Sequence, residues 1–442
     1  MNRKKIISCS VALLSVFAIL LGNMAKAAAW TGEGLPDNIC TTADGQPFEN
    51  MTDAGISITY NGSKINTNQT PVVHYQGVYM MALRQTVCRK GPKASFEHTE
   101  RTGHIRLVFQ NHVVTFYVNE KTMYADGQKY KLAAAPVEVV YTRSAKNDIL
   151  VPAEQICAAL GLACQWKTQD KTLALKKKKV SFPGKSKKTR YPYSAKKYAK
   201  LQYKRMPKVS YKKYLSYIQT KKDTTSGFKY LRVDCYRDVD KKKFKQYYQY
   251  LIRDYCREAK LSVRKSSLYN KAEVFLKAAK KYNLDPVYLV SQTFLESAYG
   301  TSLLARGNKI KKVAYRGYPR TKSGKFKTRK LKKKCKVYNL YGIKAYDKDP
   351  FVGGTSYAYY HKWTTVRRAI YGAAAYLSSQ YIRGRYAQNT LFKMRFSPVK
   401  SGLWHQYATA PHYAEAIGER MYLMSTCYQD GVKFLYDYPK FR

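Results

Sequence analysis

The sequence is poor in acidic residues, and two long stretches have none. Lys and Arg number 81 against 28 Asp and Glu, which gives a formal net charge of +53. No acid occurs between Asp170 and Asp223, or from Arg306 to Lys336. Such a chain repels itself unless salt or anionic partners offset the repulsion. Because Tyr is also frequent, at 42 residues, the composition fits nucleic-acid binders and proteins of polyanionic cell walls alike.

Long apolar runs are confined to the start of the chain. A basic start at residues 3–5 precedes an apolar stretch from Ile6 to Leu21, and small residues follow at Ala25-Lys26-Ala27. This order predicts a secretory signal peptide over residues 1–29, with an uncleaved N-terminal anchor as the alternative. We therefore expect a secreted, cell-wall-associated protein without a membrane span after cleavage. Export also argues against nucleic acid as a partner.

The cysteines and histidines show no metal-site spacing. There is no Cys-X-X-Cys, and the seven histidines are scattered, so we expect no metal and no cofactor. Cys9 lies in the signal peptide, which leaves eight cysteines. An even number in an exported chain predicts disulfides, whose connectivity the sequence leaves open.

The first half of the chain reads as a β-rich module over residues 55–176, after an N-terminal segment of residues 30–54. Alternating apolar residues, a turn signal and a glycine stop carry this interpretation. The expected elements are paired strands at Ile105–Phe109 and Val113–Val118, a hairpin around Asp126-Gly127, a short helix within Val151–Gly161, and a last strand at Thr172–Leu175.

The most telling part of this module runs from Val151-Pro152-Ala153 through Leu160-Gly161, then Gln165-Trp166-Lys167 and the last strand. With it, the module over residues 55–176 resembles the small domain named after the N-terminal domain of copper amine oxidases. The resemblance implies a wall-associated or spacing module of exported Gram-positive proteins, and no copper ligands are present. The alternative is a generic β-rich domain. Neither of these two interpretations predicts catalysis in the β-rich module.

Residues 177–224 form a basic segment in which Lys and Tyr alternate in clusters around Pro192 and Pro207. Like charges repel, so this segment is expected to stay extended as a linker. It is either a plain soluble linker or a tether to anionic wall polymers such as teichoic acids. Counterion release favours the tether.

Residues 225–442 turn to a helical pattern, with apolar residues spaced for one buried face. The expected helices carry Ala272, Phe275, Leu276 and Ala279; Val366, Ile370, Ala373 and Leu377, capped by Thr364 or Thr365; and Ala414, Ile417, Met421 and Met424, with Pro411 at the start.

Glu296 lies at the end of another predicted helix, which Asp285 caps, Pro286 begins and Gly300 stops. It follows an almost wholly apolar run and has no basic residue three or four positions away. Both desolvation and the negative helix end raise a carboxyl pKa, which is what a general acid needs. The alternative is a solvated glutamate that closes an amphipathic helix.

Five blocks follow in order from Glu296 onwards. They are LESAYGTSLLA at Leu295–Ala305, VYNLYGIKAYDKDP at Val337–Pro350, GTSYAYYHKWTTVRRAIYGAAAYLSSQYI at Gly354–Ile382, QNTLFKMRFSP at Gln388–Pro398 and HQYATAPHYA at His405–Ala414. In these blocks the sequence resembles bacterial cell-wall N-acetylglucosaminidases of glycoside hydrolase family seventy-three, most of all the glucosaminidase domains of Gram-positive autolysins. The resemblance implies an α+β chain: a mainly helical, lysozyme-like catalytic domain with a small β-hairpin lobe. It also implies cleavage of the β-1,4 bond after N-acetylglucosamine in peptidoglycan.

By this resemblance, Glu296 matches the general acid that protonates the leaving glycosidic oxygen. A second group is also needed. Asp347 is the candidate carboxylate, with Asp349 behind it, and the substrate's own acetamido group is the other possibility. The alternative for both aspartates is turn chemistry.

The remaining blocks imply substrate contacts. Asn339, Tyr341 and Gly342 match the part that lines the sugar groove, although Tyr341 fits a core position as well. Gln406 and Tyr407 belong to the HQYAT block, whose tyrosine hydroxyl is suited to orient water or stabilise charge.

Two features depart from the family. Relatives usually carry an acid after HQYAT, where this chain has Ala410. The segment Arg306–Lys336 is longer than usual, and Lys322–Lys325 reads as a hairpin tip. That segment is either a basic flap over the groove or a solvated loop. The competing functions are a lytic transglycosylase, which also works with one glutamate, and a wall-binding protein with a lapsed active site.

Overall fold

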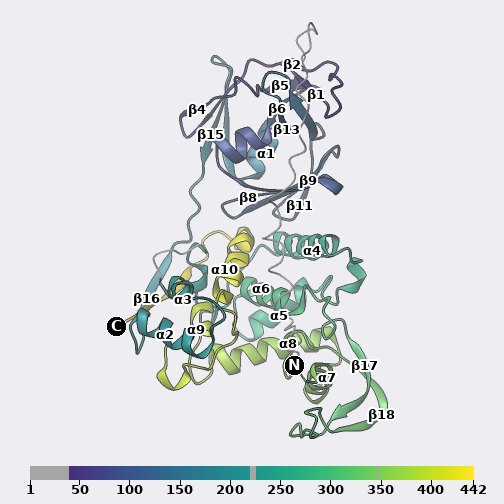
Figure 1. Ribbon diagram of the computed structural model, residues 1–442, viewed down its shortest axis with the longest axis vertical. Helices are drawn as coiled ribbons and strands as arrows, with labels where there is room; N and C mark the ends of the chain where they lie inside the picture. Colours follow the sequence, from purple (N-terminus) through teal and green to yellow (C-terminus); the bar gives the residue numbers. More distant parts are fainter. Residues whose placement is uncertain (1–38, 220–224, 346–347) are drawn as a thin grey trace, which may run out of the picture. The chain divides into compact units, whose positions relative to one another are not determined.

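A computed structural model describes residues 39–219, 225–345 and 348–442 (Figure 1). The described chain divides into a β-rich unit, residues 39–181, and a mainly helical unit, residues 182–442. Helices and sheets together place the chain in the predicted α+β class. Within these ranges, every helix is too short or too polar to cross a bilayer. The predicted signal peptide lies outside the described residues.

The β-rich unit is built from three sheets. Their strand orders are β1-β12-β13-β6-β5-β2, β11-β10-β9-β8-β7 and β14-β15-β3-β4. The strands are β1 Cys40–Thr41, β2 Thr52–Asp53, β3 Ser57–Tyr60, β4 Ser63–Ile65, β5 Val73–Tyr75, β6 Val78–Ala82, β7 Ser95–Thr99, β8 His104–Phe109, β9 His112–Tyr117, β10 Thr122–Ala125, β11 Gln128–Lys131, β12 Val137–Tyr141, β13 Lys146–Pro152, β14 Leu162–Lys167 and β15 Thr172–Lys177. The helical segments are η1 Leu83–Lys90, η2 Glu100–Thr102 and α1 Ala153–Ala159.

The predicted strand pairs of this unit are confirmed. Strands β8 and β9 pair antiparallel, as do β10 and β11. Asp126 and Gly127 both have positive φ, 49° and 78°, which matches the tight turn that favours an Asp-Gly hairpin. Strands β1 and β2 join the six-stranded sheet, so part of the predicted N-terminal segment belongs to the β-rich unit.

The predicted disulfides are absent among the described cysteines, because all eight are free thiols. Cys157 is buried in the apolar core of the β-rich unit, and its thiol hydrogen-bonds to that of Cys164. Burial raises the pKa of Cys40 and of Cys88 to about 12. Thiols with so high a pKa supply little of the thiolate that disulfide exchange needs.

The helical unit gathers its helices around α6. Helix α6 packs against α5 and α10, and α8 packs on the far side of α5 (Figure 1). The helices are α2 Ala195–Arg205, α3 Tyr211–Ile218, α4 Lys241–Glu258, α5 Ala272–Lys281, α6 Pro286–Ser297, α7 Pro350–Tyr360, α8 Val366–Leu377, α9 Leu391–Arg395 and α10 Tyr413–Leu423. The shorter turns are η3 Phe228–Tyr230, η4 Val263–Lys265, η5 Ser378–Ile382, η6 Lys400–Gly402 and η7 Met424–Cys427. The strands are β16 Gly184–Arg190, β17 Asn308–Ala314, β18 Thr328–Val337 and β19 Phe434–Lys440.

The prediction that residues 177–224 stay extended as a linker is wrong for most of the segment. Strand β16 pairs in parallel with β19, and helices α2 and α3 pack on each other. Ser194 and Ser210 cap these helices by accepting from the backbone N–H three residues on. Most of this lysine-rich stretch is therefore a folded part of the helical unit.

Tyrosines hold this stretch in place. Tyr191, Tyr198 and Tyr214 are fully buried in one cluster with Phe392 and Phe396. The Tyr191 hydroxyl donates to the Phe396 carbonyl at 2.7 Å, and that of Tyr198 donates to the Ser397 carbonyl at 2.9 Å. The lysines face outward, so burial of the aromatic face outweighs the repulsion on which the prediction rested.

The second acid-free stretch forms the antiparallel pair β17–β18. Residues 321–325 turn the chain, and Arg320 bridges to Phe326 beside the turn. The pair is anchored at its base, where the Ala314 N–H donates to Ser356 Oγ of α7 at 2.7 Å. Most lysines of β18 are exposed, so this element presents positive charge to solvent.

Candidate functional site

Helix α6 places Glu296 in its last turn. Asp285 accepts from the Tyr288 N–H at 2.9 Å, and Pro286 is the first helical residue, as the sequence predicts. Asp285 is itself fixed by Arg237, whose guanidinium lies 2.8 Å from its carboxylate. The start of the helix is thus locked by a buried ion pair.

The chain turns sharply directly after Glu296. Helix α6 ends at Ser297, and Ala298 and Tyr299 adopt φ of 47° and 53° before Gly300 at 80°. A left-handed backbone is uncommon for residues other than glycine. Its occurrence in two successive residues indicates that the surrounding packing imposes the turn, and such strain is concentrated at functional sites.

The carboxyl of Glu296 is half-buried, and its environment makes it a weak acid. Burial raises the pKa of Glu296 to about 7, against the opposing effect of hydrogen bonds from Tyr407 and Gln292. The Gln292 amide donates to Glu296 Oε1 at 2.9 Å. The raised pKa predicted from the apolar run is therefore confirmed, with desolvation as its main cause. Near neutral pH such a group both holds and gives up a proton.

The tyrosines around Glu296 form a buried hydroxyl cluster. The Tyr413 hydroxyl, at the start of α10, donates to Gln292 Oε1 at 2.6 Å. The rings of Tyr407 and Tyr413 lie 5.3 Å apart. Their pKa values are both well above the ordinary value, chiefly through burial and then through the nearby carboxylate or a second tyrosine. These phenols therefore stay neutral and act as hydrogen-bond donors or acceptors.

Gln292 and Tyr413 were not predicted as site residues. The signal for Gln292 is its spacing, one helical turn before Glu296. Tyr413 gives no local signal, because it approaches α6 from 121 residues away.

Tyr341 lies in this cluster as a packed residue. Its hydroxyl lies 2.7 Å from Thr293 Oγ1. Thr293 already donates its proton to the Leu289 carbonyl, so Tyr341 is the donor between them. Tyr341 is only 8% exposed, which favours the core alternative over direct sugar contact.

The side chain of Asn339 is hydrogen-bonded within its own loop and to Gly354. Its amide donates to the carbonyls of Ile343 and Gly354, each at 2.9 Å. Its oxygen accepts from the N–H groups of Tyr341 and Ile343. No amide proton remains for a substrate, so Asn339 positions the loop. Gly342 lies in this loop with φ of 58° and open space beside it.

Gln406 is turned toward α2. Its amide donates to Gln202 Oε1 at 2.9 Å. The same oxygen accepts from the buried Arg395 at 3.0 Å, and Arg395 also donates to the Ala410 carbonyl at 2.9 Å. The Arg395 guanidinium is thus held by the Ala410 carbonyl and by the side-chain oxygen of Gln202. Ala410 is the position at which the resemblance implies an acid. The supposed linker supports the HQYAT block directly.

The structure describes one of the two candidate aspartates. Asp347 lies outside the described residues. Asp349 Oδ2 accepts from the Phe326 N–H at 3.1 Å, so it ties the β17–β18 element to the start of α7. That contact agrees with the turn-chemistry alternative for Asp349.

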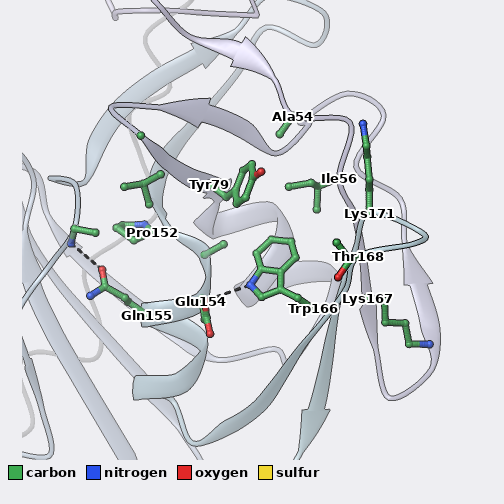
Figure 2. Close-up of a pocket in the computed structure, with 14 residues that line it drawn as sticks. Ala54, Ile56, Tyr79, Pro152, Glu154, Gln155, Trp166, Lys167, Thr168 and Lys171 are labelled. Atoms are coloured by element: carbon green, nitrogen blue, oxygen red, sulfur yellow. Dashed lines mark hydrogen bonds between the residues drawn. The ribbon is translucent and has the colours of Figure 1, made fainter.

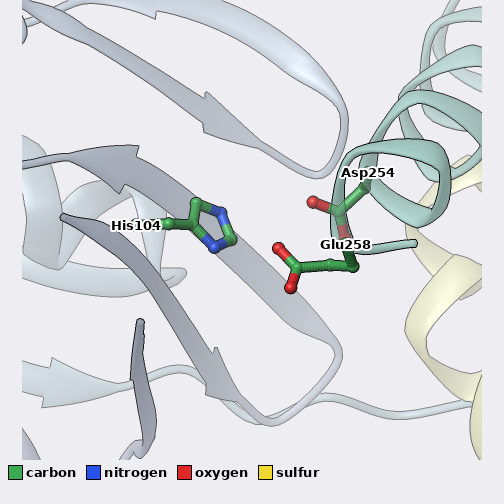
Figure 3. Close-up of side chains that lie close together, drawn as sticks. All are labelled: His104, Asp254 and Glu258. Carbon is green, nitrogen blue, oxygen red and sulfur yellow. The ribbon is translucent and has the colours of Figure 1, made fainter. Parts of the chain in front are cut away.

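A second group of acids lies on α4. Asp254 and Glu258 are one turn apart on this helix, while His104, drawn with them in Figure 3, lies on β8 of the other unit. Within the helix, Arg257 pairs with Asp254 and lies 3.6 Å from the Glu258 carboxylate. We therefore interpret these acids as ion-paired residues of α4 and assign no metal to the described residues.

Comparison with known proteins bears on this site. Residues 272–425 match the glucosaminidase family model, described as mannosyl-glycoprotein endo-beta-N-acetylglucosaminidase. The chain is 37% identical over 184 residues to a beta-N-acetylglucosaminidase of Bacillus subtilis (strain 168), across 41% of this chain and 18% of that protein. It is 39% identical over 155 residues to a bifunctional autolysin of Staphylococcus epidermidis, across 35% and 10%.

A crystal structure of the major bifunctional autolysin is 24% identical, with a TM-score of 0.38, across 59% of this chain and all of that one. The chain spans less than a fifth of the curated relatives' length. The family match includes Glu296 and the cluster around it. Residues 272–425 therefore belong to the glucosaminidase family, and the family resemblance predicted from the sequence is confirmed for this part of the chain.

Proposed function

We propose that this protein is an exported peptidoglycan hydrolase that cleaves the β-1,4 bond after N-acetylglucosamine, in wall remodelling or cell separation. The observation that carries the proposal is the half-buried Glu296 carboxyl, whose pKa burial raises to about 7. The names of the relatives, a beta-N-acetylglucosaminidase and an autolysin, support the same substrate class. A lysozyme-like arrangement of the helical unit, with β17–β18 as a small lobe, is part of the proposal.

Glu296 acts as the general acid. At neutral pH a large share of this carboxyl carries its proton, which it gives to the leaving glycosidic oxygen as the bond to the anomeric carbon breaks. Glu296 Oε1 accepts from the Gln292 amide, so the other carboxyl oxygen is left to carry the proton. Tyr413 fixes the orientation of the Gln292 amide. Tyr407, hydrogen-bonded to Glu296, orients the same carboxyl and stabilises charge.

A second group must stabilise the positive charge that develops on the sugar. Within the described residues, the side chains that shift the pKa of Glu296 are the uncharged Tyr407 and Gln292. Asp347 and the substrate's own acetamido group therefore remain the two candidates, as nucleophile or as activator of water. Tyr341, Gly342 and Gln406 are proposed to shape the sugar groove through the loops that they hold.

The basic surfaces are proposed to attract anionic wall polymers such as teichoic acids. The exposed lysines of β18 and of α2 supply the charge. Release of counterions from a dense polyanion drives such binding and makes it sensitive to salt.

Digestion of purified peptidoglycan tests the proposal. The products are reduced with borohydride and identified by mass spectrometry. Reduced N-acetylglucosamine ends are expected, and Glu296→Gln is expected to lose at least about a hundredfold in rate, since general acid catalysis contributes about 10²–10⁴-fold. The matched control is Glu273→Gln, an exposed carboxylate on α5, which should leave the rate unchanged.

Other products would overturn the assignment. Anhydro-muramic ends would identify a lytic transglycosylase. If no new ends formed on several wall types, a binding role would replace catalysis. An unchanged rate in Glu296→Gln would remove Glu296 from the mechanism.

A further inference from the structure

The β-rich unit contains a pocket of about 660 Å³ that lies outside the family-matched domain. It opens where the β5–β6 turn, the start of α1 and the β14–β15 turn meet (Figure 2). Its lining combines apolar side chains with polar ones. The residues used here are Ile56, Tyr79, Glu154, Trp166, Lys167 and Lys171.

Two aromatic rings form one wall of the pocket. The centroids of Tyr79 and Trp166 lie 5.3 Å apart, with their planes tilted by 49°. The Trp166 indole N–H donates to Glu154 Oε2 at 3.2 Å, which fixes the ring. Tyr79 is 44% exposed. An exposed, fixed pair of rings offers flat apolar faces of the kind that pack against the C–H face of a sugar.

Two lysines stand at the rim of the pocket. Lys167 and Lys171 follow Trp166 in the chain and lie at its edge, with their ammonium ends directed into solvent (Figure 2). Both are exposed, and neither forms an ion pair within the part of the chain that the structure describes. Ammonium groups without partners beside an aromatic wall suit a ligand that carries a carboxylate or a phosphate.

We infer that this pocket binds a carboxylate-bearing amino-sugar of a glycan strand. The sugar face packs on Tyr79 and Trp166, the positive charge of Lys167 and Lys171 at the rim attracts its carboxylate, and the free oxygen of Glu154 accepts from a hydroxyl or an amide N–H. In its choice of polymer the inference rests on the proposed function. Two sites on one chain that bind the same polymer raise the effective concentration of the enzyme at its substrate.

Calorimetry on the full chain tests the inference. The protein carries Glu296→Gln, and the probe is a soluble peptidoglycan oligosaccharide with free lactyl carboxylates. Two bound oligosaccharides per chain are expected, one in the groove at residue 296 and one in the pocket. Combining Tyr79→Ala with Trp166→Ala should remove one of them. Tyr130→Ala, also 44% exposed in this unit, should keep both.

A charge variant keeps the test valid if the aromatic variant unfolds. Lys167→Ala with Lys171→Ala should weaken the pocket site about tenfold, the equivalent of about 1.4 kcal/mol, since hydrogen bonds to charged groups contribute at least that much. The loss should vanish with carboxyl-reduced oligosaccharide. Lys121→Ala with Lys129→Ala, exposed lysines of the same unit, serves as the control.

The outcomes separate this inference from the proposed function. If every variant binds two oligosaccharides with unchanged affinity, the pocket is not a glycan site, whatever the result of digestion. If the protein with Glu296 intact cuts no wall but the pocket variants still lose a binding site, only the catalytic proposal fails. Displacement of the oligosaccharide from the pocket by a polyphosphodiester at lower concentration would overturn the choice of ligand.

Discussion

The two acid-free segments of the helical unit carry similar charge but fold differently. Residues 184–218 form β16, α2 and α3, with their tyrosines in the core. Residues 308–337 form β17 and β18, with most of their lysines in solvent and few apolar side chains inside. The first segment supports the HQYAT block, and the second extends a positive surface. Net charge therefore does not decide which segment folds into a domain.

The arrangement of apolar residues decides it. In α2 the buried positions Tyr198, Ala199 and Gln202 share one helical face, and lysines occupy the others. Long lysine side chains keep their ammonium groups in water even when the helix beneath them packs. In β18, lysine stands on both faces of the strand, so only pairing with β17 and the anchor on α7 order it.

The largest expected effect comes from emptying the tyrosine core of the first segment. Tyr198→Ala should lower the free energy of unfolding by about 3–5 kcal/mol, because a buried ring is lost and the Ser397 carbonyl loses its donor. Urea unfolding measures it. The control is Tyr203→Ala, 44% exposed on the same helix, with an expected change below about 0.5 kcal/mol. If both variants changed the free energy of unfolding by the same small amount, the segment would be a linker after all.

The next effect tests whether the first segment supports the site. Gln202→Leu removes the oxygen that accepts from Arg395 and Gln406, at a cost of about 1–3 kcal/mol in unfolding free energy. Because the HQYAT block then loses an anchor, kcat/KM on soluble glycan should fall about ten- to hundredfold. Gln202→Glu keeps an acceptor and should stay near the parent. A loss of stability with full activity would mean that α2 only stabilises the fold.

A smaller effect on stability is expected in the second segment. Lys330→Gln, Lys332→Gln and Lys334→Gln together should change the unfolding free energy by less than about 0.5 kcal/mol. Binding to phosphate-bearing walls should weaken. The slope of log K against log salt concentration should become shallower by about one for each contact removed. Lys196→Gln, Lys200→Gln and Lys204→Gln on α2 are the matched set. A comparable loss of binding is expected in that set, and unchanged binding there would confine the polymer to the second segment.

The smallest effect concerns the pKa of Glu296. Since the acid must be protonated, kcat/KM should fall above about pH 7, tenfold per pH unit. The Tyr407 hydrogen bond lowers this pKa, so Tyr407→Phe should move the alkaline limb to higher pH, by less than about one unit. Tyr315→Phe, which is exposed, should leave the limb in place. A shift to lower pH would contradict the assigned cause.

Local patterns in the sequence predicted much of the fold. The cap, start and apolar run of α6 all lie close together in the sequence, as do the two strands of β8–β9 and of β10–β11. The raised pKa of Glu296 followed from the same run. These features depend on neighbours in the chain, which is why periodicity and turn chemistry found them.

Features that depend on distant partners were missed. The contact of Gln202 with Arg395 spans 193 positions, and that of Tyr413 with Gln292 spans 121. Asn339 matches a groove residue by motif, but only the positions of the Ile343 and Gly354 carbonyls show that its amide is already used. The expected disulfides failed for a similar reason, since cysteine number says nothing of distance or burial.

The parallel pairing of β16 with β19 also has a consequence for the order of folding. Thr189 and Asp437 are hydrogen-bonded although 248 positions separate them. Contacts of such long range form late, because the entropy of closing a large loop opposes them until the intervening chain has condensed. The β-rich unit, whose strands lie within residues 40–177, is free of this constraint. A chain still being made would therefore hold a finished β-rich unit before the fold that supports Glu296 is complete.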